Sequence, residues 1–177
     1  MYQSNILLIY TGGTIGMIKS SETGALKSFD FDNLLIKIPE LNLLDCTIET
    51  VSFEEAIDSS NMSPTASALS FMLENLSKPV IFTGSQLPIG DLRTDAKENL
   101  ITSIQVASLR DNDGPIIKEV GLYFEYKLYR GNRTTKINAE HFEAFASLNY
   151  PDLLESGVHL KINKDFLLKP SNDSALK

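Results

Sequence analysis

An apolar run that ends in two adjacent glycines constrains the fold more than any other feature of this sequence. The run covers residues 5–10, Asn-Ile-Leu-Leu-Ile-Tyr, and the loop Thr11-Gly-Gly-Thr14-Ile-Gly16 follows it directly. A short continuous apolar segment bounded by glycines is typical of a fully buried parallel strand. Adjacent glycines let the chain turn sharply and bring its backbone close to a ligand. We therefore expect the hydroxyls of Thr11 and Thr14 at the carboxyl end of a strand, where open α/β sheets bind ligands.

Length and charge bound the class of protein. A chain of 177 residues with 42% apolar content can bury one core, which favours a single domain. A net charge of −7 disfavours nucleic-acid and anionic-membrane partners. No run approaches the ~18–20 apolar residues of a transmembrane helix, and the first residues do not resemble a signal peptide. The single cysteine, Cys46, excludes an internal disulfide. We expect a soluble protein of the reducing cytoplasm.

Strand-like and helix-like segments alternate along the chain, which is typical of a layered α/β sheet. Further strands are expected at 46–53, 78–83 and 119–126, and helices at 32–38, 65–76 and 95–109. The strand at 78–83 ends, like the first, in a glycine turn. From about Val158 the composition becomes that of a linker leaving the domain.

The common nucleotide and hydrolase motifs do not fit the first loop. Its glycine spacing fails the dinucleotide fingerprint, and no lysine stands where a phosphate-binding P-loop needs one. The serine-hydrolase elbow G-x-S-x-G does not occur. With His141 and His159 as the two histidines, a Ser-His-Asp triad or a metal cluster is disfavoured. A threonine nucleophile activated by a neutral lysine remains, with a phosphate cradle as the weaker alternative.

Two other polar segments could complete such a site. Lys136 lies in the run Tyr129-Arg-Gly-Asn-Arg-Thr-Thr-Lys136-Ile-Asn138, and Asp58, Ser59 and Ser60 offer an acid and two hydroxyls. For these residues and for Thr14, a purely structural role is the alternative to a functional one. Thr14 could be a helix N-cap, Lys136 part of a solvated loop, and residues 58–61 an ordinary turn.

Four motifs together resemble a known family. The segments LLIYTGGTIGM, DSSNMSP, TASALSFMLENLSKPVIFTGSQLP and LYRGNRTTKINAEHFEAFASLNYPDLLESG are similar to those of type I, cytoplasmic L-asparaginase and span nearly the whole chain. The resemblance implies hydrolysis of the asparagine side-chain amide to aspartate and ammonia, without cofactor or metal. It also implies a homo-oligomer, dimer or tetramer, whose sites borrow groups from a neighbouring subunit.

The resemblance assigns roles to particular residues. Thr14 would be the nucleophile that forms an acyl-enzyme, and Lys136 would belong to a second Thr-Lys-Asp group that assists proton transfer. Ser59 would hold the substrate's α-carboxylate, with Ser60 beside it. A backbone oxyanion hole is expected for such acyl transfer. Near neighbours without a chemical part would be Asp58, Thr11 and Gly13.

The chain also departs from the family. The motif His-Gly-Thr-Asp-Thr-Met, expected at the end of a central strand, is absent, and Pro64 runs straight into Thr65. Roughly one helix-and-strand unit of a βαβ repeat is missing there, and with it the threonine and aspartate that would partner Lys136. Gly24-Ala25-Leu26 stands where many relatives have a tyrosine near the nucleophile. The resemblance also implies a second, smaller domain, and we expect this sequence to stop in the linker before it.

These observations lead to one fold and two functions. We expect an α/β domain over residues 1–160, with an open, mainly parallel sheet and helices on both faces, and the start of an interdomain linker at 161–177. The join at Pro64–Thr65 is either an internal deletion or the place of residues that the written sequence lacks. The function is that of an asparaginase, or that of a catalytically dead fragment acting as an assembly or small-ligand-binding module.

Overall fold

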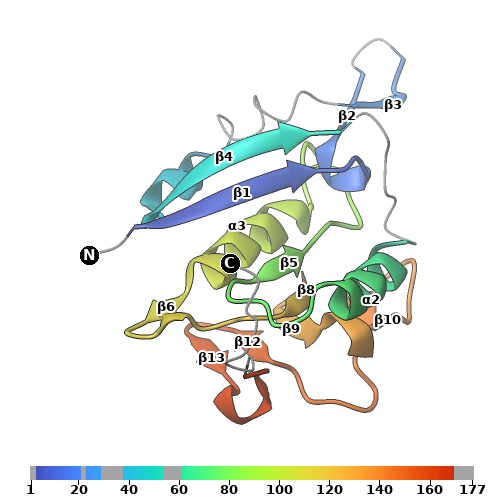
Figure 1. Cartoon of the computed structure of the whole chain (residues 1–177). Coiled ribbons are helices and arrows are strands. Elements are labelled where there is room, and N and C mark those ends of the chain that lie inside the picture. The colour runs from blue at the N-terminus through green and yellow to red at the C-terminus, as the bar shows by residue number, and fades with distance from the viewer. Residues whose placement is uncertain (1–2, 21–22, 29–37, 54–60, 170–177) are drawn as a thin grey trace.

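The computed structural model describes residues 3–20, 23–28, 38–53 and 61–169. The regular elements among these residues are two α-helices, short strands and 3-10 helices (Figure 1). The helices are α2 (Met62–Met72) and α3 (Ala96–Ser108). The strands are β1 (Ser4–Tyr10), β2 (Met17–Lys19), β3 (Leu26–Ser28), β4 (Cys46–Ser52), β5 (Val80–Phe82), β6 (Arg110–Asp111), β7 (Gly114–Pro115), β8 (Val120–Phe124), β9 (Lys127–Arg130), β10 (Thr135–Lys136), β11 (Phe145–Ala146), β12 (Leu154–Ser156) and β13 (Leu160–Ile162). The 3-10 helices are η1 (Thr14–Gly16), η2 (Pro39–Leu43), η3 (Gly131–Arg133) and η4 (Lys164–Phe166).

The strands form one larger sheet and several pairs. β1 and β4 pair in parallel, from Ser4 opposite Cys46 to Tyr10 opposite Ser52. The larger sheet has the order β13-β12-β9-β8-β5, in which only β5 and β8 are parallel. The prediction of a mainly parallel sheet is therefore wrong, because the described part of the fold is mixed.

A tight hairpin causes this change of direction. Glu125 and Tyr126 join β8 to β9, and both have positive φ angles, 43° and 70°. Two residues can connect antiparallel neighbours only, since a parallel connection needs a crossover of a dozen residues or more. The sequence prediction of one strand over 119–126 ran through this turn.

Helices cover both faces of β5, as predicted. Ala66 and Leu69 of α2 lie in one cluster with Val80, whereas Val106 of α3 lies with Ile81, the next residue along the strand. Successive side chains of a strand point to opposite faces, so the two helices lie on opposite sides. α3 matches its predicted range closely.

Helix α2 begins three residues before its predicted start and passes through the Pro64–Thr65 join. The Thr65 N–H donates to the Asn61 carbonyl at 2.9 Å, within regular helical geometry. The predicted helix at 32–38 lies, except for Ile38, outside the described residues.

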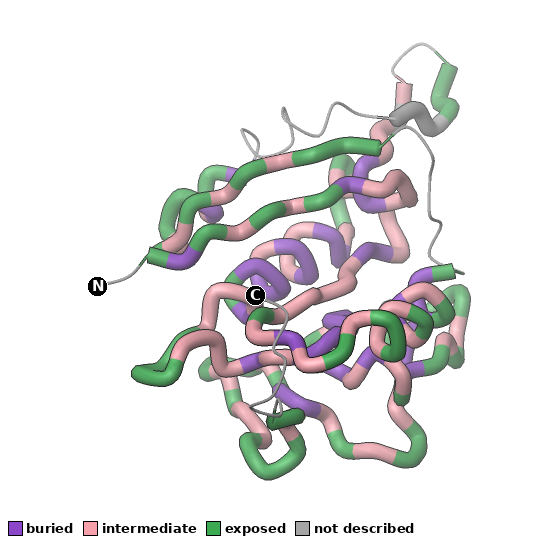
Figure 2. The backbone as a smooth tube through the Cα atoms, viewed as in Figure 1, coloured by how far each residue is buried: buried purple, intermediate pink, exposed green. Residues whose placement is uncertain are grey.

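β1 is only half covered, which contradicts the expectation of a fully buried strand. Ile6 and Leu8 pack against Leu100 and Ile104 of α3 in the first core cluster. Leu7 and Ile9, which point to the other face, are 57% and 52% exposed (Figure 2). The apolar run is therefore a parallel strand, as predicted, but no described residues cover one of its two faces.

The segment after Val158 belongs to the larger sheet at least as far as the end of β13. β13 pairs with β12, which pairs with β9. Beyond η4, the Leu168 N–H donates to the Glu119 carboxylate at 2.7 Å. Residues 161–168 of the expected linker thus pack on the described domain, and the domain boundary stays a prediction.

Candidate active site

The loop after β1 is a compact turn built on two glycines in the left-handed region. Gly12 and Gly13 have φ angles of 86° and 91°, which a side chain would strain. Thr14 then opens η1. A Cβ on Gly16 would lie 2.3 Å from the Tyr10 hydroxyl oxygen, and the buried Tyr10 donates to the Gly13 carbonyl at 3.4 Å. Close packing against Tyr10 therefore fixes the loop that carries Thr14.

This loop and a second glycine turn line a small pocket of about 60 Å³ at the carboxyl ends of β1 and β5. Thr11 and Thr14 meet here, as the sequence predicted. Among the described residues, no hydrogen-bond partner for the half-buried Thr14 hydroxyl is found. The lining residues are Thr11, Gly12, Gly13, Thr14 and Ile15 from the first turn, Phe82, Thr83, Gly84 and Ser85 from the second, and Met62 from α2.

The second turn contributes hydroxyls to which sequence reasoning assigned no role. Ser85 is 2% exposed, and its hydroxyl donates to the Leu87 carbonyl at 2.6 Å. The Thr83 hydroxyl donates to the Asn99 carbonyl at 3.4 Å. The signal was present, because the strand at 78–83 ends in a glycine turn like that of the first strand.

A buried amide holds this second turn in place. Asn99 of α3 is fully buried, and its Nδ2 donates to the Gly84 carbonyl at 3.0 Å and to Asp95 at 3.2 Å. Its Oδ1 accepts the N–H of Glu125 at 3.0 Å. Asp95 in turn accepts the backbone N–H groups of Gln86 and Leu87. A satisfied buried network of this kind fixes a single geometry for the turn.

Glu125 adds an acidic group at the same end of the sheet. Burial, followed by the charges of Asp95, Glu98 and Glu143, raises the pKa of Glu125 to about 7. Its backbone has the unusual φ of 43°. Carboxyl groups with raised pKa values and residues in strained conformations are both common at functional sites.

Lys136 is not part of the pocket lining. It lies on β10, opposite Phe145 of β11, with its Nζ 6.0 Å from the centre of the Phe145 ring. Phe145 belongs to the same apolar cluster as Met62 and Phe82, which do line the pocket. The structure therefore places Lys136 beside Phe145, whose apolar cluster extends to two residues of the pocket lining.

The Lys136 segment is anchored to helix α2. Ser63 donates through its hydroxyl to the Thr134 carbonyl, and a Cβ on Gly131 would lie 3.0 Å from the Ala66 carbonyl oxygen. Asp58, Ser59 and Ser60 lie outside the described residues, so their roles stay predictions.

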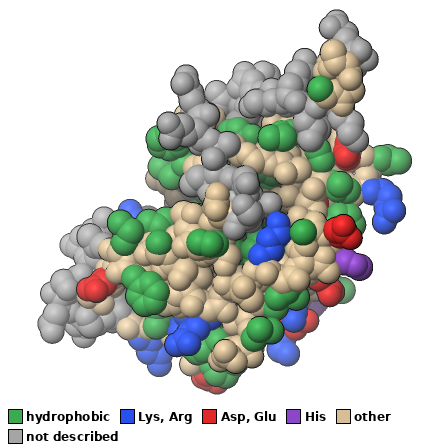
Figure 3. All heavy atoms as spheres, turned by 90° about the vertical axis from the view of Figure 1, so that its right-hand side faces the viewer, with side chains coloured by type: hydrophobic (Ala, Val, Ile, Leu, Met, Phe, Trp, Pro, Cys, Tyr) green, Lys and Arg blue, Asp and Glu red, His purple; other side chains and the backbone are tan. Residues whose placement is uncertain are grey.

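The face toward which β1 points carries scattered charges rather than a continuous basic patch (Figure 3). Within the described ranges, no group of three or more His, Cys, Asp or Glu side chains is placed to hold a metal ion. None of the helices in those ranges has the length and apolar character needed to span a membrane.

Comparison with known proteins identifies the family. The model of the asparaginase N-terminal domain matches residues 5–65 and 62–167, so the chain belongs to the asparaginase family. L-asparaginase 1 of Escherichia coli K12 is 40% identical over 195 residues, which cover 91% of this chain and 56% of that protein. The crystal structure of L-asparaginase I from Vibrio cholerae matches with a TM-score of 0.82 and 34% identity, over 97% of this chain and 60% of that one. The resemblance to type I L-asparaginase is confirmed.

Another relative has a different name. The mouse 60 kDa lysophospholipase is 45% identical over 115 residues, which cover 65% of this chain and 20% of that protein. A probable cytoplasmic L-asparaginase from Campylobacter jejuni, at 20% identity and a TM-score of 0.67, supports the fold alone.

The chain spans little more than half the length of the E. coli and V. cholerae proteins that it matches. The two family matches meet at residues 62–65, at the Pro64–Thr65 join. The alignment with the E. coli protein runs over 195 positions, which is more than the 91% of this 177-residue chain that takes part in it. Part of the E. coli sequence therefore has no counterpart in this chain.

Proposed function

We propose that this chain carries the nucleophile half of an asparaginase site, with Thr14 as the residue that attacks the side-chain amide of L-asparagine. One observation carries the proposal. In a chain of the asparaginase family, Thr14 opens on a pocket between two glycine turns at the carboxyl ends of β1 and β5. Attack by the Thr14 hydroxyl would form an acyl-enzyme and release ammonia, and water would then release aspartate.

The remaining parts of the chemistry are assigned from this chain's own residues. The backbone N–H groups of the tight first turn would stabilise the oxyanion of the tetrahedral intermediate. Lys136 would assist proton transfer, and Ser59, with Asp58 and Ser60 beside it, would hold the substrate's α-carboxylate. No cofactor is assigned.

The second Thr-Asp pair that should work with Lys136 is absent from the sequence. We therefore propose that the active protein contains residues beyond this sequence and works in the cytoplasm as a homo-oligomer. Intact mass spectrometry of the purified native protein directly tests whether it contains additional residues. A mass of 19.6 kDa would contradict it, and size-exclusion chromatography with light scattering measures the assembly.

The test of Thr14 is ammonia release from L-asparagine by the native protein. Thr14→Ala should lower the rate at least about a hundredfold, because the acyl-enzyme step is lost. Thr47→Ala is the matched control, since Thr47 is an exposed threonine on β4, and it should keep the wild-type rate. Ammonia release unchanged by Thr14→Ala would overturn the assignment.

A catalytically dead fragment is the second candidate, and the missing Thr-Asp pair favours it. Such a fragment would bind aspartate saturably in calorimetry but release no ammonia. Absence of both binding and turnover would reject both functions.

A further inference from the structure

A second cavity lies at the opposite end of β5 from the candidate active site. It has a volume of about 150 Å³ and is formed at the amino ends of β5 and β8, where Val80 pairs with Val120. Its walls come from the end of α2 and the turn after it, the start of β8, η3 and the segment after η4. None of its described lining residues lines the pocket around Thr14. We call it the amino-end cavity.

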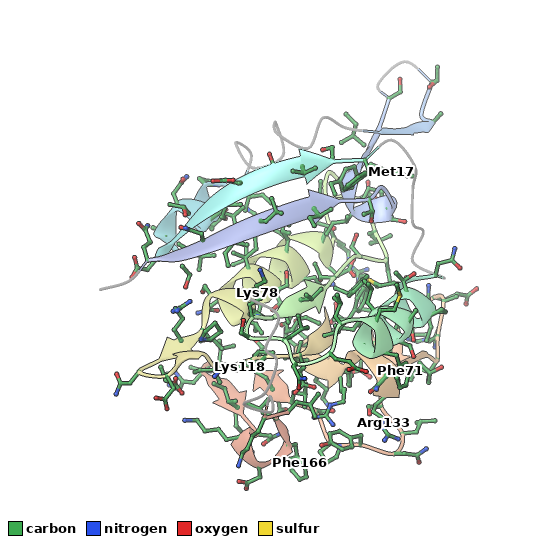
Figure 4. The ribbon with its side chains drawn as sticks, viewed as in Figure 1. Met17, Phe71, Lys78, Lys118, Arg133 and Phe166 are labelled. Atoms are coloured by element: carbon green, nitrogen blue, oxygen red, sulfur yellow. The ribbon has the colours of Figure 1, made fainter. Side chains whose placement is uncertain are left out.

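The lining of the amino-end cavity carries more positive than negative charge. Its cations are Lys118 (Figure 4), Arg130 and Lys169, and Glu119 is the one acid among its described lining residues. The Glu119 carboxylate is already paired, because it accepts the Arg130 Nε at 2.6 Å and the Leu168 N–H at 2.7 Å. Neither Lys118 nor Lys169 forms an ion pair with another described residue. The cavity therefore favours an anionic ligand.

A buried amide oxygen adds a hydrogen-bond acceptor to this lining. Asn132 Oδ1 is buried and has no hydrogen-bond partner in the described part of the chain. Its neighbour Gly131 packs closely on α2, since a Cβ there would lie 2.7 Å from the Ser70 Oγ. The Ser70 hydroxyl is already used, because it donates to the Ala66 carbonyl at 2.8 Å. A buried acceptor without a donor costs free energy, so a ligand that brings a hydroxyl to Asn132 Oδ1 gains affinity.

Apolar side chains and the volume limit the rest of the ligand. Leu73, Leu76, Val120 and Leu168 also line the cavity, and Leu76 and Val120 are buried in one cluster. A cavity of about 150 Å³ takes up a molecule of about six non-hydrogen atoms, the size of benzene. The ligand is therefore a small anion with one short alkyl group.

We propose that the amino-end cavity binds a short hydroxycarboxylate of the size of lactate. The carboxylate lies beside Lys118 and Lys169, the hydroxyl donates to Asn132 Oδ1, and the alkyl group packs on the leucine side chains. An amino acid of the same size fits less well, because its ammonium group faces the three cations of the lining. The proposal concerns binding and does not depend on the proposed hydrolysis.

The probe is sodium lactate, titrated into the ¹⁵N-labelled native protein at constant ionic strength and followed by NMR. The side-chain amide of Asn132 and the backbone amides of Leu76 and Val120 should shift along one saturable curve. The amides of Thr14 and Ser85, which line the other pocket, should not follow that curve.

Isobutyrate is the matched ligand, because a methyl group replaces the hydroxyl of lactate and the carboxylate is kept. It should bind at least about fivefold more weakly, since Asn132 Oδ1 then stays without a donor. Lactamide keeps the hydroxyl but has no charge, and it should also bind more weakly than lactate.

Variants separate the acceptor from the charge. Asn132→Leu should abolish the preference for lactate over isobutyrate, whereas Lys118→Gln should weaken the binding of both acids about three- to fivefold. Lys161→Gln is the matched control, because Lys161 is an exposed lysine of β13 outside the lining, and it should keep the wild-type affinities. If Asn132→Leu does not fold, the comparison of the two acids in the wild type still tests the acceptor.

Four results would overturn the proposal: no saturable binding of lactate, equal affinity of the wild type for lactate and isobutyrate, unchanged affinity in Lys118→Gln, or tighter binding of inorganic phosphate than of lactate. The last result would mean that charge alone explains the binding. Thr14→Ala should bind lactate like the wild type, so failure of the proposed hydrolysis and failure of lactate binding are distinguishable.

Discussion

Removal of one charge from the ion pair between Arg130 and Glu119 should destabilise the domain severely. The Arg130 Nε lies 2.6 Å from a Glu119 carboxylate oxygen, and their side chains are 11% and 2% exposed. Glu119 also accepts the Leu168 N–H, while Arg130 donates to the Phe166 carbonyl at 2.6 Å and lies 4.4 Å from the centre of the Tyr150 ring. The pair thus ties residues 166–168 to the neighbouring strands β8 and β9 of the larger sheet.

The expected magnitude follows from burial. Arg130→Met would leave the Glu119 carboxylate buried with no cation beside it, which costs about 3–5 kcal/mol. That is a large part of a domain's stability of about 5–15 kcal/mol. Glu119→Gln should cost less, because Arg130 keeps its bond to Phe166 and its contact with Tyr150. The double variant should be more stable than Arg130→Met, since no unpaired charge remains in it.

Urea unfolding followed by circular dichroism measures all four proteins. Phe166 and Met17, which directly follows η1, lie far apart in the molecule (Figure 4). The variants therefore act on stability without touching the pocket. A free energy of unfolding for Arg130→Met within about 1 kcal/mol of the wild type would refute the reasoning. A double variant less stable than Arg130→Met would do the same.

Two further predictions concern the site. Gly16→Ala places a Cβ 2.3 Å from the Tyr10 hydroxyl oxygen and 2.4 Å from Cζ, so it should cost about 1–3 kcal/mol in urea unfolding; an equal cost in a Tyr10→Ala background would show that this contact is not the cause. Burial and neighbouring acids raise the pKa of Glu125 to about 7 in the folded state, above an unfolded value of about 4.3. The folded state then holds the proton more tightly, so its stabilising effect is complete below the unfolded pKa and is lost as the pH rises through 7. The wild type should lose more Tm than Glu125→Gln between about pH 5 and pH 8, and parallel Tm curves for the two proteins would contradict this.

The local sequence was sufficient to predict the site's first turn. Gly12 and Gly13 are required by their positive φ angles, and an apolar run followed by such a turn indicates a strand that ends at a ligand site. The same reasoning did not predict that one face of this strand, β1, is exposed. Leu7 and Ile9 are open because no described helix lies over them, and coverage depends on segments elsewhere in the chain.

The antiparallel half of the sheet could not be predicted from the sequence. Glu125-Tyr126 forms a two-residue turn without the Asn-Gly or Asp-Gly pair that usually indicates one. β12 and β13 are short. The segment that contains and follows them is held against the domain by contacts between residues distant in sequence, such as that between Leu168 and Glu119. The position of Lys136 beside Phe145 likewise depends on the pairing of β10 with β11, which no spacing in the sequence specifies.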